Sequence, residues 1–232
     1  MLILFDIDGT LTATSECDLR CYAATFQELF GFPLPYLDWH AYRHVTDSGI
    51  IGEVLEQRRG SYVTPEELVE FERRFVLKLE TEFCRHPEAF REIPGAKALL
   101  ESLRSVVGLA VALATGGMRA SALFKLSKVG IDGQELPAAF ANDSFTREGI
   151  AKLAILRAGG ATDVIYVGDG VWDVNTAASL GLRFIGITQE SSSERLQRAG
   201  ANVWLSDFLD QGAFLRALDT AAAPCAGKAG HS

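Results

Sequence analysis

The amino-acid sequence predicts an α/β fold, a doubly wound parallel sheet that carries a small helical cap. Three observations predict this class: short apolar runs that end in polar loops, helical patterns between those runs, and one long helical segment that interrupts the alternation. Continuous apolar runs are typical of parallel strands, because such strands are buried on both faces. Strands that alternate with helices favour a parallel sheet with helices on both sides.

Four apolar runs predict the strands of this sheet. Each is followed directly by a polar or glycine-rich loop, where the strand should end. The predicted strands are Leu2–Phe5, Gly108–Ala114, Val164–Gly168 and Leu182–Ile187. Ligands bind outside the carboxyl ends of the strands in open parallel sheets, so we expect the loops after the first three runs to meet in space.

Five helical patterns lie among these strands. A glycine closely follows four of them and would end each helix in the left-handed conformation. The predicted helices are Ala96–Ser105, Ala120–Val129, Arg147–Ala158, Val174–Leu180 and Ser193–Ala199.

The segment 13–92 breaks the alternation, because it shows helical periodicity and little strand pattern. Its third helix has a favourable start, with Thr64 as N-cap and Pro65 at the first helical position. The predicted helices of the segment are Cys17–Phe30, Ile50–Arg58 and Pro65–Phe83.

These patterns divide the chain into a core, a cap and a tail. Pro94 and Gly95 mark the return from the helical segment to the sheet. The last residues are small and polar, which predicts a loose end. We therefore expect a Rossmann-like core of residues 1–12 and 93–221, a helical cap of residues 13–92 and a flexible tail of residues 222–232.

Composition excludes several classes of partner. The formal net charge of -8 gives no basic field that would attract nucleic acid or an anionic membrane. No apolar stretch approaches the roughly 20 residues of a membrane span, and no basic segment precedes the first apolar run as in an export signal. The four cysteines form no Cys-x-x-Cys pair and are expected to be free thiols. We expect a cytoplasmic protein, monomeric or homodimeric, without nucleic-acid or membrane partners.

Carboxylates follow two of the predicted strands. Asp6 and Asp8 lie directly after the first strand, and Asp169 and Asp173 follow the third. Acids that meet at one sheet edge would repel one another unless a hard cation lay among them, and oxygen ligands beside a phosphate favour Mg²⁺. Structural roles are the alternative: Asp6 and Asp8 could cap a loop, and Asp173 could interact with a helix N-terminus.

A third polar loop follows the second predicted strand. Thr115, Gly116 and Gly117 offer a hydroxyl and backbone N–H groups near the start of a helix, an arrangement that suits phosphate oxygens. No G-x-G-x-x-G pattern follows the first strand, which argues against a dinucleotide-binding enzyme.

The three loop sequences DIDGT, ATGG and GDGVWD, in this order, resemble the first, second and fourth motifs of the haloacid dehalogenase superfamily. The helical segment falls where that family places a cap, and phosphoglycolate-type phosphatases are the nearest family likeness. The resemblance implies that Asp6 is the nucleophile, Asp8 the general acid and base, and Thr115 a phosphoryl-binding hydroxyl. It implies phosphate-binding roles for Gly9, Thr10, Gly116 and Gly117, and a Mg²⁺ site formed by Asp6, Asp8, Asp169 and Asp173, with the Asp8 backbone carbonyl also at the metal.

The chain departs from the family at the third motif, which is normally a lysine in a Lys-Pro setting. No Lys-Pro occurs, and the segment 142–150 stands at the expected place. Arg147 could supply the cation there, because a guanidinium holds phosphate oxygens bidentately. Lys125 and Lys152 are the alternatives.

We therefore expect a Mg²⁺-dependent phosphatase that hydrolyses a small phosphorylated metabolite through a phosphorylated Asp6. A sugar-phosphate mutase of the same superfamily is the main alternative, although Asp18 and Asp47 stand where we align a histidine and an arginine of β-phosphoglucomutases. A phospho-accepting regulator is a second alternative, but such domains lack a cap. Substrate contacts are expected in the cap, from Arg43 above all; the other polar candidates are Arg20, His44, Thr46 and Asp47.

Overall fold

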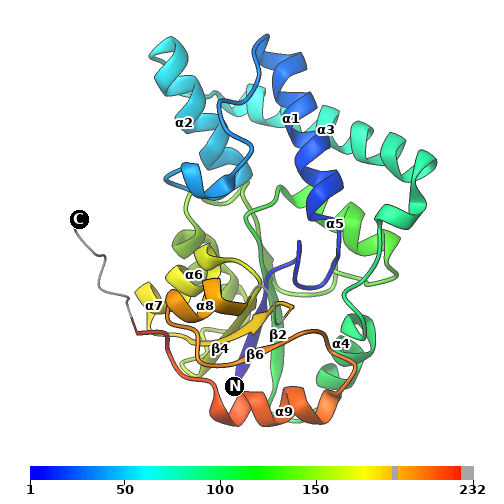
Figure 1. Cartoon of the computed structure of the whole chain (residues 1–232), viewed down its shortest axis with the longest axis vertical. Helices are drawn as coiled ribbons and strands as arrows, with labels where there is room; N and C mark the ends of the chain where they lie inside the picture. Colours follow the sequence, from blue (N-terminus) through cyan, green and yellow to red (C-terminus); the bar gives the residue numbers. More distant parts are fainter. Residues whose placement is uncertain (190–192, 226–232) are drawn as a thin grey trace.

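Six parallel strands form one sheet in the computed structural model, which describes residues 1–189 and 193–225 (Figure 1). The strands are β1 (Leu2–Phe5), β2 (Ala110–Ala114), β3 (Ala138–Ala139), β4 (Val164–Gly168), β5 (Arg183–Ile187) and β6 (Trp204–Leu205), in the order β3-β2-β1-β4-β5-β6. In this register Phe5 lies between Leu113 and Val167, so the loops after β1, β2 and β4 begin at one edge of the sheet. The predicted doubly wound parallel sheet is confirmed.

Helices cover both faces of the sheet. One face carries α4 (Ala96–Arg104), α5 (Arg119–Lys128) and α9 (Gln211–Thr220), and the other α6 (Arg147–Arg157), α7 (Val171–Leu180) and α8 (Ser193–Arg198). Side chains of β1 alternate between the two apolar cores: Ile3 and Phe5 pack on the first face, Leu2 and Leu4 on the second. The continuous apolar run of β1 therefore reflects burial on both sides.

The cap helices α1 (Ser15–Phe30), α2 (Asp47–Arg59) and α3 (Pro65–Arg85) lie beyond the strand ends, with the short turns η1 (Trp39–Ala41) and η2 (Pro87–Ala89). They share an aromatic core in which Tyr22 contacts Phe71 and Phe75. Met118 and Ala141, from the loops after β2 and β3, belong to the same apolar cluster. The cap is thus packed against the loops that carry the predicted motifs.

Local capping explains where two of the predicted helices begin. Thr64 and Glu67 form a reciprocal capping box at the start of α3, as the sequence indicates. Helix α7 begins at Val171, three residues before its predicted start, because the Asp173 carboxylate accepts the Gly170 N–H and closes the first turn. Asp173 is therefore fixed by its own helix.

Five elements were not predicted: the two-residue strands β3 and β6, the short turns η1 and η2, and helix α9. Beyond α9 the chain remains paired with the sheet, since Ala222 accepts the Phe184 N–H and donates its own N–H to Asn202. Residues 226–232 of the predicted tail lie outside the described residues. No helix in the described part of the chain is long and apolar enough to span a membrane.

Gly95 offers a test of how the segment before α4 packs against the segment before α9. It has φ +82°, and a Cβ there would lie 2.7 Å from the carbonyl carbon and oxygen of Phe208. Gly31 has φ +80° with nothing within 4 Å of its Cβ position, so it controls for backbone strain alone. We expect Gly31→Ala to lower the free energy of unfolding by about 1 kcal/mol, and Gly95→Ala by roughly 1–3 kcal/mol more, in urea denaturation. Equal losses would contradict the close approach.

Candidate active site

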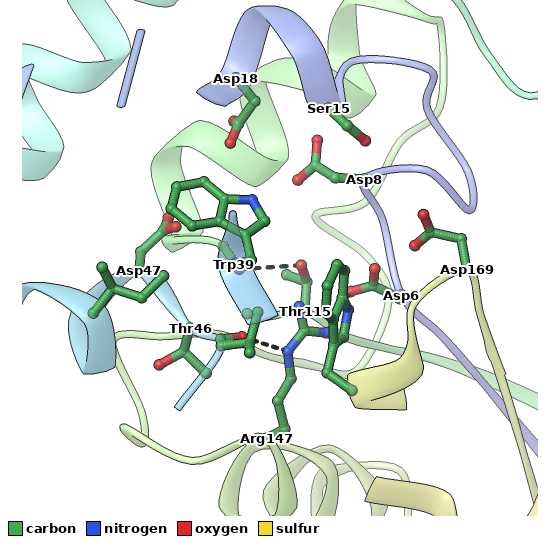
Figure 2. A pocket seen from close by; sticks show the side chains of 15 residues that line it. Asp6, Asp8, Ser15, Asp18, Trp39, Thr46, Asp47, Thr115, Arg147 and Asp169 are labelled. Carbon is green, nitrogen blue, oxygen red and sulfur yellow. Dashed lines mark hydrogen bonds and ion pairs between the residues drawn. The ribbon is translucent and has the colours of Figure 1, made fainter. Parts of the chain in front are cut away.

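The loops after β1, β2 and β4 meet the cap around a cavity of about 130 Å³ (Figure 2). Asp6, Thr115 and Asp169 reach it from the strand side, whereas Asp18 and Asp47 reach it from the cap. The lining residues are Asp6, Asp8, Ser15, Asp18, Trp39, Val45, Thr46, Asp47, Ile50, Thr115, Gly116, Gly117, Arg147, Asp169 and Trp172. Three sequence motifs and the cap therefore converge on one space.

Asp6, Asp169 and Asp173 form a carboxylate trio in which Asp6 and Asp173 are buried and Asp169 is half-buried. Each offers an oxygen, and these oxygens lie within 4.8 Å of one another. Burial and the negative charge of Asp173 raise the pKa of Asp6 to about 7, against the lowering effect of Arg147. Burial and the charge of Asp173 also raise the pKa of Asp169 well above its usual value. A cation among these carboxylates would favour their ionised forms.

The donor set of the trio fits a hard divalent cation. Asp169 Oδ1 is buried and has no hydrogen-bond partner among the described residues, which leaves one carboxylate oxygen free to bind an ion. Asp173 is more fully engaged: Oδ1 accepts from Arg147 at 2.9 Å and from Tyr166 at 3.2 Å, and Oδ2 accepts the Gly170 N–H. Asp6 and Asp169 are thus the members of the trio best placed to bind a metal directly.

The carboxylate of Asp8 lies apart from this trio. Its Oδ1 accepts from the Thr14 hydroxyl at 2.7 Å, and its Oδ2 accepts from Lys125 Nζ at 2.6 Å. Lys125 is fully buried and also bonds Asp18 of the cap helix α1. Burial raises the pKa of Asp18 to about 6, although Lys125 opposes the shift. The Asp8–Lys125–Asp18 group therefore joins the β1 loop to the cap.

Arg147 lies beside the carboxylate trio and pairs with two of its members. Its Nη1 donates to Asp6 at 3.2 Å and to Asp173 at 2.9 Å, and its Nε donates to the backbone carbonyl of Val45 at 2.7 Å. Burial alone would lower its pKa, but the two carboxylates raise it on balance, so the guanidinium stays charged. Lys152 is exposed and does not line the cavity.

Two glycines of the motifs are required by close packing. Gly9 has φ +80°, and a Cβ there would overlap the Asp169 carboxylate. A Cβ at Gly116 would lie 2.7 Å from Arg147 Nε and from the Val45 carbonyl oxygen. Both positions allow charged groups to approach the backbone of the motif loops.

Thr115 and Gly117 line the cavity, whereas Thr10 does not. Thr115 is 1% exposed, and its hydroxyl accepts the Gly117 N–H at 3.2 Å. Thr10 is fully buried, with a hydroxyl that has no partner among the described residues.

Arg43 is not brought to this cavity. It is exposed and lines a neighbouring cavity of about 340 Å³ together with His40 and His44. Arg20 pairs with Glu16 and Glu82 on the cap surface. Of the polar cap residues considered from the sequence as substrate contacts, Thr46 and Asp47 line the first cavity.

The sequence analysis missed three residues of this site as contacts: Asp18, Trp39 and Trp172. Asp18 could have been suspected, because it lies one helical turn after Ser15 on a helix that starts just beyond the Asp8 loop. Trp172 adjoins a motif acid. Trp39 belongs to the short turn η1, for which no sequence pattern was available.

Comparison with known proteins places the chain in a family. The family model described as haloacid dehalogenase-like hydrolase matches residues 1–181, so the chain belongs to the haloacid dehalogenase-like hydrolases. Comparison with curated proteins gave no significant match.

Solved structures share the fold at low sequence identity. A hydrolase from Pseudomonas syringae has a TM-score of 0.69 and 22% identity, covering 94% of this chain and 97% of its own. A provisionally assigned β-phosphoglucomutase from Bacteroides vulgatus has a TM-score of 0.66 and 21% identity, with coverages of 94% and 88%. A predicted phosphoglycolate phosphatase from Haemophilus somnus has a TM-score of 0.54 and 18% identity, with coverages of 92% and 97%. The shared fold does not choose between these activities.

Asp47 should make the free energy of unfolding depend on pH. Burial and the charge of Asp18 raise its pKa to about 8, against the lowering effects of Lys125 and of the Met118 N–H, which donates to Oδ2 at 2.8 Å; Asp8 adds to the rise. An unfolded aspartate has a pKa of about 3.9. Between about pH 4 and 8 the folded chain retains a proton that the unfolded chain loses, so this group makes the free energy of unfolding fall as pH rises.

We therefore expect Asp47→Asn to gain stability relative to wild type as pH rises from 5 to 8, in urea denaturation. Asp219→Asn, at an exposed position of α9, is the control and should show no such trend. The same stability difference at both pH values would show that Asp47 is ionised throughout.

Proposed function

We propose that this protein is a Mg²⁺-dependent phosphatase that hydrolyses a small phosphate monoester through a phosphorylated Asp6. The observation that carries the proposal is the meeting of Asp6 with the unpartnered oxygen of Asp169 and the guanidinium of Arg147, beside the Thr115 hydroxyl. A nucleophilic carboxylate can approach a phosphoryl anion only where positive charge offsets their repulsion.

Asp6 and Asp169 would hold Mg²⁺, which supplies charge neutralisation at the phosphoryl group when bound. The Asp6 carboxylate attacks phosphorus in line with the leaving oxygen and forms an acyl phosphate. Arg147 keeps a positive charge beside Asp6 throughout. Thr115 and the backbone N–H groups of its loop bind phosphoryl oxygens.

Asp8 transfers the protons. As an acid it protonates the leaving oxygen, and as a base it then takes a proton from the water that hydrolyses the acyl phosphate. Lys125 donates to Oδ2 of Asp8, and the Thr14 hydroxyl donates to Oδ1. Lys125 and Thr14 hold the Asp8 carboxyl group in one position while it gives up and regains a proton.

A sugar-phosphate mutase is the rival function within the family. The provisional β-phosphoglucomutase from Bacteroides vulgatus has the same fold, so the fold leaves this reading open. The cap side of the cavity argues against it, because Asp18 and Asp47 stand where we align a histidine and an arginine of the mutases. Assays that couple conversion of sugar-phosphate isomers to a dehydrogenase, beside phosphate release, would decide between the two.

Asp6→Asn tests the nucleophile. The amide keeps the size of the side chain but cannot attack phosphorus, so phosphate release from p-nitrophenyl phosphate with Mg²⁺ should fall by about a thousandfold or more. The free energy of unfolding of Asp6→Asn should not fall below that of the wild type, since burial already disfavours the charged form of Asp6. Asp219→Asn is the matched control, and chelation of the metal should abolish wild-type turnover. Wild-type rates from Asp6→Asn would refute the assignment.

A further inference from the structure

More carboxylates than cations line the cavity. Arg147 is the one basic side chain among the described residues that line it, and it already bonds both Asp6 and Asp173. Lys125, buried behind the wall, bonds both Asp8 and Asp18. Each cation is therefore shared by two carboxylates.

Asp47 is the cap carboxylate that remains without a cation. Its Oδ2 accepts the Met118 N–H at 2.8 Å, and among the described residues no ion pair includes it. The rise in its pKa has this environment as its cause: burial first, then the negative charge of Asp18. A cation that entered the cavity would find in Asp47 a carboxylate to which no side-chain cation among the described residues is bonded.

Asp47 faces the space where the leaving group of a phosphate ester would lie. A Cβ at Gly117 would stand 3.6 Å from Thr115 Oγ1, 3.7 Å from Asp8 Oδ2 and 3.9 Å from Asp47 Oδ2. These three groups therefore surround one gap. Thr115 and Asp8 are the proposed phosphoryl-binding hydroxyl and general acid, so Asp47 lies next to the alcohol part of the substrate.

An indole ring completes this end of the cavity. Figure 2 shows Trp39 on the cap side together with Asp18 and Asp47. Indole faces attract cations, most strongly where water is excluded. The second lining indole, Trp172, already has the Arg147 guanidinium 5.8 Å from its ring centre. Trp39 packs against the rings of Tyr22 and Tyr42, and no side-chain cation of the described residues lies over it, so this indole can take a ligand cation.

Resting on the phosphatase function proposed above, we propose that the cavity selects phosphate monoesters whose alcohol part carries an ammonium group, bound by Asp47 and Trp39. The ammonium would favour the ionised form of Asp47 and make a charge-assisted hydrogen bond with it, the proton of Asp47 passing to solvent. A carboxylate in the same place would meet Asp47, Asp18 and Asp8, and the part of the chain that the structure describes offers no free cation there to receive it. The site therefore discriminates by the charge of the leaving alcohol.

Three esters of nearly equal size isolate this charge: 2-aminoethyl, 2-hydroxyethyl and carboxymethyl phosphate, with cationic, neutral and anionic ends. We expect kcat/KM to fall in that order, with at least a tenfold difference between the first and the last. An ester that is not turned over is ranked by its inhibition constant against p-nitrophenyl phosphate. A carboxymethyl ester that equals or exceeds the aminoethyl ester would overturn the inference.

Asp47→Asn separates recognition from a structural role. The amide keeps the oxygen that accepts the Met118 N–H but removes the charge. We expect kcat/KM for the aminoethyl ester to fall tenfold or more, while the hydroxyethyl ester changes less than threefold. An equal loss for all three esters would mean that Asp47 merely supports the fold, and would also overturn the inference. Asp219→Asn should leave the ranking unchanged.

The p-nitrophenyl phosphate assay reports on the phosphatase function separately, because its aromatic leaving group carries no ammonium. Turnover of that ester with no preference for the aminoethyl ester defeats the inference alone. Absence of Mg²⁺-dependent turnover of every ester defeats the phosphatase proposal and this inference with it.

Discussion

The mutual repulsion of carboxylates in a buried space is the constraint on which the rest of this structure depends. The parallel register of β1 with β2 and β4 brings the motif loops to one sheet edge, where Asp6, Asp169 and Asp173 meet. Such charges are costly to bury unless they are paired. Arg147 and Lys125 each pair with two carboxylates. A divalent cation between Asp6 and Asp169 would neutralise the remaining negative charge on the strand side.

The same two cations hold the cap over the site. Lys125 bonds the β1 loop and the cap helix α1 at once, and Arg147 bonds both the acids and the Val45 carbonyl of the cap. Uncharged contacts reinforce this junction: Thr46 donates to the Phe145 carbonyl and Ser48 to the Ala141 carbonyl. The contacts that neutralise the carboxylates therefore also position the cap. A change of charge in the cavity should alter how the cap packs.

Much of the fold could be predicted because its signals are local. The β1 and β4 runs coincide with the observed strands, since continuous apolar residues and an abrupt polar loop leave few alternatives. The strands β3 and β6 have two residues each and pair only at the sheet edges, so no periodicity could reveal them. Helix α9 was missed although its buried face packs Phe214 against Phe5.

The motif residues of the site were predictable from the sequence, whereas the cap residues were predictable only in part. Asp6, Thr115 and Asp169 follow strands and were brought together by topology, and Arg147 was expected from its place before the fourth strand. Thr46 and Asp47 were among the expected cap contacts and line the cavity, whereas Trp39 and Asp18 were not named as contacts, because the position of a cap segment over the sheet is set by tertiary packing. Arg43 was a reasonable expectation by charge, but the turn after η1 directs it to another cavity.

The central claim is that Asp6 and Asp169 bind one divalent cation beside the phosphoryl position. Crystals grown with Mn²⁺, measured at a wavelength where manganese scatters anomalously, test it most directly. The account predicts an anomalous peak within coordination distance of both carboxylates, with Arg147 still bonded to Asp6. A peak bound by neither residue, or none at all in fully loaded crystals, would contradict it.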